Sequence, residues 1–197
     1  MLYRRGMLAG EVAGNRLDRY VLPVDQPAPL DADGFLDVSR AAWWGSRENR
    51  PQRVADLAGR PSGFVLLAAG GAGKSFVMNR LSEREPASLT VDLRARTAPE
   101  LRAAVRDAIT SGEPVYLDTL EDVANYEPAA FRVLEQELTT AAAQGIPWWL
   151  ACWPAAWDAN LAAALKGSFP GFRELKLLPL TRPAAEEFVA SAGISPS

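Results

Sequence analysis

Residues 68–75, with the sequence AAGGAGKS, carry the clearest chemical signal in the chain. They match the phosphate-binding motif G-x-x-x-x-G-K-[ST] at Gly73, Lys74 and Ser75, while Ala68 stands where the motif has its first glycine. In such a loop, successive backbone N–H groups surround nucleotide phosphates, and small residues permit their close approach. The lysine reaches the terminal phosphates and the serine hydroxyl is a ligand for Mg²⁺. The predicted nucleotide-binding residues are Gly70, Gly71, Ala72, Gly73, Lys74, Ser75 and Phe76.

A second group of candidate residues is acidic and lies in the sequence VYLDTLED, residues 115–122. Its apolar run ends at Asp118, and ligands of open α/β sheets bind at the carboxyl ends of parallel strands. We therefore expect Asp118 to help Ser75 hold Mg²⁺. Glu121 or Asp122, which follow in the loop, would orient an attacking water. These two acids are the predicted catalytic residues.

The composition narrows the chemistry further. The 197 residues include no histidine, which excludes His-based triads and acid–base catalysis by histidine. They include one cysteine, which excludes intrachain disulfides and Cys-cluster metal sites. The formal net charge is −3, so the sequence shows no basic signal for nucleic acid or for an anionic membrane. The remaining chemistry must come from carboxylates, lysine, arginine, hydroxyls, backbone amides and a bound cation.

The phosphate motif requires a strand before it and a helix after it, and the sequence predicts both. Residues 63–69 form a continuous apolar run, typical of a strand buried on both faces, and residues 74–81 can form a helix. Further strands are predicted over 88–93, 114–120, 148–153 and 174–180, with helices between them, one of them opened by a Thr97–Glu100 capping box. This alternation predicts a three-layer α/β fold with a five-stranded parallel sheet.

The passage from Lys74 to Asp118 is long enough for one complete helix–strand–helix unit. This favours an arrangement in which residues 148–153 lie between the phosphate-loop strand and the acidic strand. Numbered along the chain, the five strands then have the order 5-1-4-3-2.

Two regions are predicted along the chain. Residues 1–60 form an irregular, Pro- and Asp-rich arm or linker with a short helix, and residues 61–197 form the nucleotide-binding domain. No signal peptide or membrane-spanning run is apparent, which predicts a cytoplasmic protein.

Four segments in this order resemble the STAND class of P-loop NTPases, a class related to AAA+ ATPases, and within it the bacterial NACHT-like and NB-ARC-like ATPases. They are AAGGAGKS (68–75), YLDTLEDV (116–123), WWLACWPAAW (148–157) and LLPLTRPAAEEFVASAGI (177–194). The resemblance implies an ATP- and Mg²⁺-binding switch that signals, for example in defence, and associates with itself or with other protein domains. It also implies that the chain ends, at Ser197, where the family's helical lid begins, without winged-helix and sensor domains.

Two departures from the family pattern concern hydrolysis. The last two acids of the acidic segment are exchanged, as Glu121 and Asp122, and Trp153 stands where relatives often have a polar sensor residue. ATPase activity therefore stays open, with slow or absent turnover consistent with both departures. Two alternatives also stay open: a small-molecule P-loop kinase, although residues 154–171 hold only Lys166 as a basic residue, and a pseudo-NTPase that keeps the fold for protein contacts.

Overall fold

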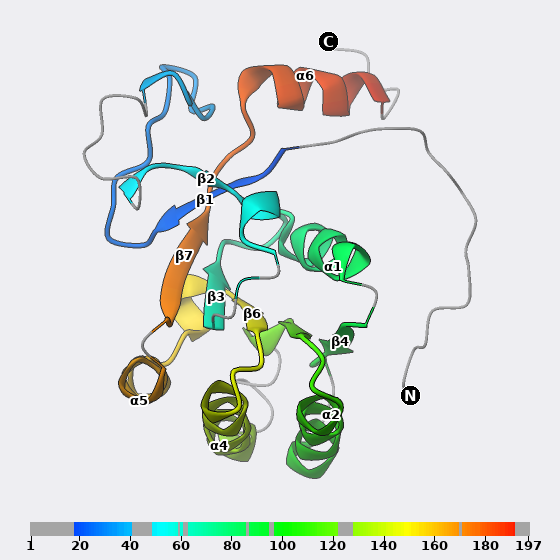
Figure 1. The fold of residues 1–197 in the computed structure, drawn as a ribbon. Helices are drawn as coiled ribbons and strands as arrows, with labels where there is room; N and C mark the ends of the chain where they lie inside the picture. The colour runs from blue at the N-terminus through cyan, green and yellow to red at the C-terminus, as the bar shows by residue number, and fades with distance from the viewer. Residues whose placement is uncertain are drawn as a thin grey trace.

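The computed structural model describes residues 18–40, 49–58, 60, 63–85, 87–94, 97–121, 128–169 and 171–191. Within these ranges, one seven-stranded sheet has helices on both faces, which makes a three-layer α/β fold (Figure 1). The strands are β1 (Tyr20–Pro23), β2 (Gln52–Arg53), β3 (Gly63–Leu67), β4 (Leu89–Asp92), β5 (Val115–Asp118), β6 (Trp148–Cys152) and β7 (Arg173–Leu177). The helices are α1 (Lys74–Arg84), α2 (Ala98–Ser111), α4 (Pro128–Ala143), α5 (Ala159–Ser168) and α6 (Arg182–Ser191), with short 3-10 helices η3 (Val54–Asp56) and η4 (Pro154–Ala156).

The sheet order is β2-β1-β7-β3-β6-β5-β4. The strands from β7 to β4 are parallel and are the five predicted ones, and β6 lies between β3 and β5 as expected. Their order, β7-β3-β6-β5-β4, is the predicted 5-1-4-3-2, but the sheet is not limited to these five parallel strands. β1 pairs antiparallel with β7, and β2 with β1, so these two strands extend the predicted order at the β7 edge and make the seven-stranded sheet mixed.

The continuous apolar run of β3 reflects burial on both faces. Val65 and Leu67 belong to the core beneath α2, α4 and α5. Phe64 and Leu66 belong to the core beneath α1 and η3. Because side chains alternate along a strand, only a strand covered on both sides needs apolar residues at every position. β3 is thus a rigid central support for the loop that follows it.

Helix starts follow the local sequence signals. In α2 the backbone N–H of Thr97 donates to the Glu100 carboxylate at 2.9 Å, and the predicted capping box is present. The Asp158 carboxylate accepts from the backbone N–H groups of Asn160 and Leu161, both at 2.8 Å, at the start of α5. None of the described helices is long and apolar enough to cross a bilayer.

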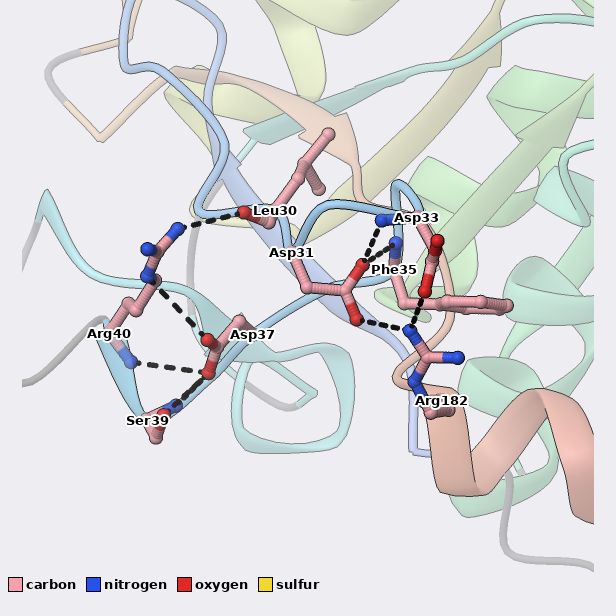
Figure 2. A network of polar contacts seen from close by, with 8 residues as sticks. All are labelled: Leu30, Asp31, Asp33, Phe35, Asp37, Ser39, Arg40 and Arg182. Atoms are coloured by element: carbon pink, nitrogen blue, oxygen red, sulfur yellow. Dashed lines mark hydrogen bonds and ion pairs between the residues drawn. The ribbon is translucent and has the colours of Figure 1, made fainter.

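Part of residues 1–60, expected to form an irregular arm or linker with a short helix, is regular structure. β1 extends the sheet, and residues 30–40 fold into a loop beside the start of α6 (Figure 2). Arg182 of α6 forms ion pairs with Asp31 (3.0 Å) and Asp33, and its guanidinium lies 4.7 Å from the centre of the Phe35 ring. The short helix expected near residues 51–58 is the 3-10 turn η3. The described part of the arm is therefore built into the α/β domain.

Candidate functional site

The glycine loop, which we define as residues 68–73, connects the carboxyl end of β3 to the start of α1. Gly71 and Gly73 have left-handed backbone angles, φ 75° and φ 91°, which glycine adopts without strain. The N–H of Ala68 donates to the carbonyl of Cys152 at 3.2 Å and so ties the loop to β6. Ala68 itself is not among the described residues with positive φ, so alanine is tolerated in place of the motif's first glycine.

Lys74 is the first residue of α1, and its side chain is folded beneath the glycine loop. It is only 6% exposed. Its Nζ donates to the carbonyl oxygens of Ala68 at 3.0 Å and Ala69 at 3.3 Å. The same Nζ lies 3.5 Å from Oε1 of Glu121 and 5.8 Å from the centre of the Trp153 ring. A buried ammonium is thus shared among three oxygen acceptors, each of which a phosphate oxygen could replace.

Glu121 is the acid that the structure brings to this lysine. It is 4% exposed, and its second oxygen, Oε2, is buried without a hydrogen-bond partner in the described part of the chain. An unpaired buried carboxylate oxygen costs free energy and leaves one acceptor for a water or hydroxyl. Burial, and after it the negative charge of Glu121, raise the pKa of the nearby Cys152 thiol to about 12, so this cysteine is an inert part of the core.

Asp118 lies at the carboxyl end of β5, directly beside Asp92 at the end of β4. The residue between the two carboxylates is Thr119, which has φ 64°, a strained angle for a β-branched side chain. Its N–H donates to Asp118 at 3.0 Å, and its hydroxyl donates to Asp92 at 2.9 Å. The side chain of Arg94 and the Thr119 hydroxyl help lower the pKa of Asp92 to about 2. Asp92 lies in the strand predicted over residues 88–93, and the sequence pattern gives no sign that it belongs to this group of acids.

The other predicted nucleotide-binding residues line the outer side of this region. Ser75 is exposed, and Phe76 is 37% exposed with the Arg80 guanidinium 5.4 Å from its ring centre. The Trp153 ring, 43% exposed, lies against the glycine loop, since a Cβ on Gly70 would be 3.4 Å from it. Asp122, the other predicted catalytic acid, lies outside the described residues.

Arg19 also belongs to this region, although it is not among the predicted site residues. It comes from the segment expected to be a linker, and its Nη2 donates to the carbonyls of Ala72 (2.9 Å) and Leu178 (3.1 Å). It therefore connects the glycine loop to the residue that follows β7. Its only sequence signal is a charged residue next to the short apolar run YVLP, which is too weak to identify a site.

No protein-family model matches the chain, and no curated protein matches its sequence. Among solved structures, the chain is similar to one described as a DNA replication initiation factor, with a TM-score of 0.45 and 10% sequence identity. It is also similar to the replication initiator DnaA bound to AMPPCP and single-stranded DNA, with a TM-score of 0.46 and 12% identity. Each similarity covers 73% of this chain and 49% or 50% of the other, so this chain spans about half the length of the structures it matches.

Proposed function

We propose that this chain is an ATP-binding module in which the nucleotide's phosphates occupy the glycine loop. The observation that carries the proposal is the position of Lys74, a buried cation at the start of α1, directly under a loop with two left-handed glycines. The N–H groups of residues 70–73 would bind phosphate oxygens, aided by the positive end of the α1 dipole. Lys74 would exchange its carbonyl acceptors for the terminal phosphates. Ser75 and Phe76 complete the binding residues.

Mg²⁺ is part of the proposal as a partner of the nucleotide. A serine hydroxyl and one carboxylate, from Ser75 and Asp118, are hard oxygen donors of the kind that Mg²⁺ prefers. Among the described residues, no group of three or more acidic, histidine or cysteine side chains could hold a metal ion by itself. Ser75 and Asp118 would therefore hold the ion together with phosphate and water oxygens, and it would neutralise phosphate charge.

Glu121 is the proposed residue for orienting an attacking water. Its Oε2 is already an unused acceptor, and its Oε1 becomes available once Lys74 turns to the phosphates. Asp122 belongs to the same proposal by its place in the sequence. Slow or absent hydrolysis belongs to the same proposal, because Trp153 places an aromatic ring, and no polar sensor side chain of its own, against the loop.

At the finer level, we propose a cytoplasmic STAND-type signalling or defence switch, on the four sequence segments given above. Two contacts support a switch. Arg19 links Leu178, which follows β7, to the glycine loop, and Arg182 links α6 to Asp31 of the arm. Phosphoryl transfer from ATP to a metabolite would favour the kinase alternative instead. A folded protein without nucleotide affinity would favour the pseudo-NTPase alternative.

The test is equilibrium binding of ATP·Mg²⁺ to the full chain by isothermal titration calorimetry. We expect a Kd between ~1 μM and ~1 mM for the wild type, and a loss of measurable binding for Lys74→Ala. Lys166→Ala is the matched control, because Lys166 is exposed in the last turn of α5, and it should bind as the wild type does. Asp118→Asn should bind ATP with a smaller dependence on Mg²⁺. A wild type that binds no ATP, or a Lys74→Ala variant that binds normally, would contradict the proposal.

A further inference from the structure

Arg19 is fixed in position by the edge of the sheet. Its own carbonyl accepts from the N–H of Val54 at 2.9 Å, and the carbonyl of the next residue, Tyr20, accepts from the N–H of Leu178 at 2.9 Å. The backbone at Arg19 is therefore held from both sides before its side chain makes any contact. This matters because a long side chain loses less conformational entropy in binding when its starting point is already rigid.

The guanidinium of Arg19 lies against the glycine loop at the start of α1. Besides the two carbonyl bonds of Nη2, its Nη1 is 3.0 Å from the position that a Cβ on Gly73 would take. Glycine at residue 73 thus serves both the left-handed angle of the loop and the close approach of this cation. Arg19 and Lys74 are two positive charges at the same turn of backbone.

The charge of Arg19 has no counter-ion in the described part of the chain. No ion pair within 4.0 Å is found there for Arg19, although Arg53, Arg106 and Arg182 each pair with a carboxylate. Its Nε is buried without a hydrogen-bond partner, and burial lowers the pKa of the guanidinium. Arg19 is thus a partly buried cation that makes only neutral contacts, and an anion beside it would offset the cost of burying its Nε.

We propose that Arg19 is a second cation of the nucleotide site, whose charge stabilises the phosphates bound in the glycine loop while its carbonyl bonds hold the loop to the end of β7. This inference rests on the proposed function, since it needs a polyphosphate in the loop. Lys74 is partly neutralised by Glu121, whereas Arg19 is not, so Arg19 supplies the larger share of uncompensated positive charge. The ligand is the phosphate chain, not the base or the sugar.

Charge and positioning can be separated with two substitutions. Arg19→Lys keeps the positive charge and loses the planar fork that bridges the two carbonyls. Arg19→Gln keeps a neutral donor for a carbonyl and loses the charge. The control is Arg53→Gln, because Arg53 is exposed on β2 and contacts Asp18 and Tyr20 of the same arm without contacting the glycine loop. Thermal unfolding of each variant shows whether the arm stays folded.

The measurement is the Kd of the full chain for ATP·Mg²⁺ and for inorganic tripolyphosphate, which has the phosphates without base or sugar. We expect Arg19→Gln to weaken both by about tenfold or more, as for loss of a charge-assisted contact, with a smaller salt dependence of tripolyphosphate binding. Arg19→Lys should stay within about threefold of the wild type, and Arg53→Gln should be unchanged.

Three results would overturn this inference while leaving the proposed function intact. The first is an unchanged Kd in Arg19→Gln, and the second is an equal loss of affinity in Arg19→Lys and Arg19→Gln. The third is a loss of affinity for ATP in Arg19→Gln without a loss of affinity for tripolyphosphate. If Arg19→Gln does not fold, the Arg19→Lys variant decides, and a tenfold or larger loss in it overturns the inference. A wild type that binds neither ligand would instead refute the proposed function, and this inference with it.

Discussion

Replacing Glu121 with glutamine should strengthen nucleotide binding, although Glu121 is one of the proposed catalytic residues. The Glu121 carboxylate lies 3.5 Å from the ammonium of Lys74, so under the proposed function it would compete with incoming phosphates for that ammonium. It also places a negative charge where the terminal phosphates would bind. Glutamine has nearly the same shape but no charge, so it removes both the competition and the repulsion.

The size of the effect follows from the geometry of the pair. At 3.5 Å, Coulomb's law with an effective dielectric constant of about 20 gives an attraction of about 5 kcal/mol between Lys74 and Glu121. Most of this attraction is offset by the desolvation of the two buried charges. If nucleotide binding has to give up even a third of it, about 1.5 kcal/mol, Glu121→Gln lowers the Kd about tenfold.

The assay is calorimetric titration of ATP·Mg²⁺ and ADP·Mg²⁺ into the wild type, Glu121→Gln and the control Glu135→Gln, an exposed residue of α4. ADP is essential, because tighter binding of ATP alone could come from blocked hydrolysis. We expect both nucleotides to bind about tenfold more tightly to Glu121→Gln and unchanged to the control. Unchanged or weaker binding of both nucleotides to Glu121→Gln would refute the competition between Glu121 and phosphate.

Three further predictions concern the framework of the site. Gly63→Ala should lower the free energy of unfolding in urea by about 1–3 kcal/mol, because its Cβ would lie 2.3 Å from the buried Trp148 ring. Adding Trp148→Phe to this variant should restore part of the lost stability. Thr97→Ala should cost about 1 kcal/mol in the same assay by removing the capping box of α2, and an unchanged midpoint would contradict that role. Asp92 has a folded-state pKa lowered from 3.8 to about 2, so its ionised form contributes stability above pH 3.8 that is lost as the pH falls through about 2. Between pH 5 and pH 2, the free energy of unfolding should therefore change less with pH in Asp92→Asn than in the wild type. Equal changes in the two proteins would contradict this role of Asp92.

The parallel part of the fold could be predicted because its signals are local. β3 and β6 are short runs of apolar residues without polar interruption, which only a doubly covered strand requires. The capping box before α2 and Pro128 at the start of α4 mark helix starts within a few residues. The order of the strands followed from the length of chain between Lys74 and Asp118.

The antiparallel edge of the sheet could not be predicted in the same way. β1 has four residues, one of them a proline, and β2 has two, so neither gives an alternating pattern long enough to read. What holds β1 is pairing with β7, more than 150 residues later in the chain. Lys176 of β7 adds bonds to the carbonyls of Val24 (3.5 Å) and Gln26, again across a long separation. Such contacts depend on the tertiary fold and leave no local signal.

The same division applies to the candidate site. The motif predicted Lys74 at the loop, but only the structure shows that Glu121 pairs with the Lys74 ammonium and that Arg19 donates to the loop carbonyl of Ala72. Neither composition nor spacing could show which acid contacts Lys74. Asp118 and Glu121 differ in burial and in partners, and both properties depend on the neighbouring strands.

The balance of charge around the loop links these observations. Lys74 is paired with the buried acid Glu121, whereas Arg19 contacts the carbonyl oxygens of Ala72 and Leu178 and no carboxylate in the described part of the chain. A polyphosphate brings more negative charge than these two cations offset, and Mg²⁺ at Ser75 and Asp118 would make up the difference. Glu121 is then the surplus acid, and it can leave Lys74 for a water molecule only when phosphate takes its place. Under the proposed function, binding and the release of Glu121 would therefore be one event, in which removing the acid strengthens binding and removing Arg19 weakens it.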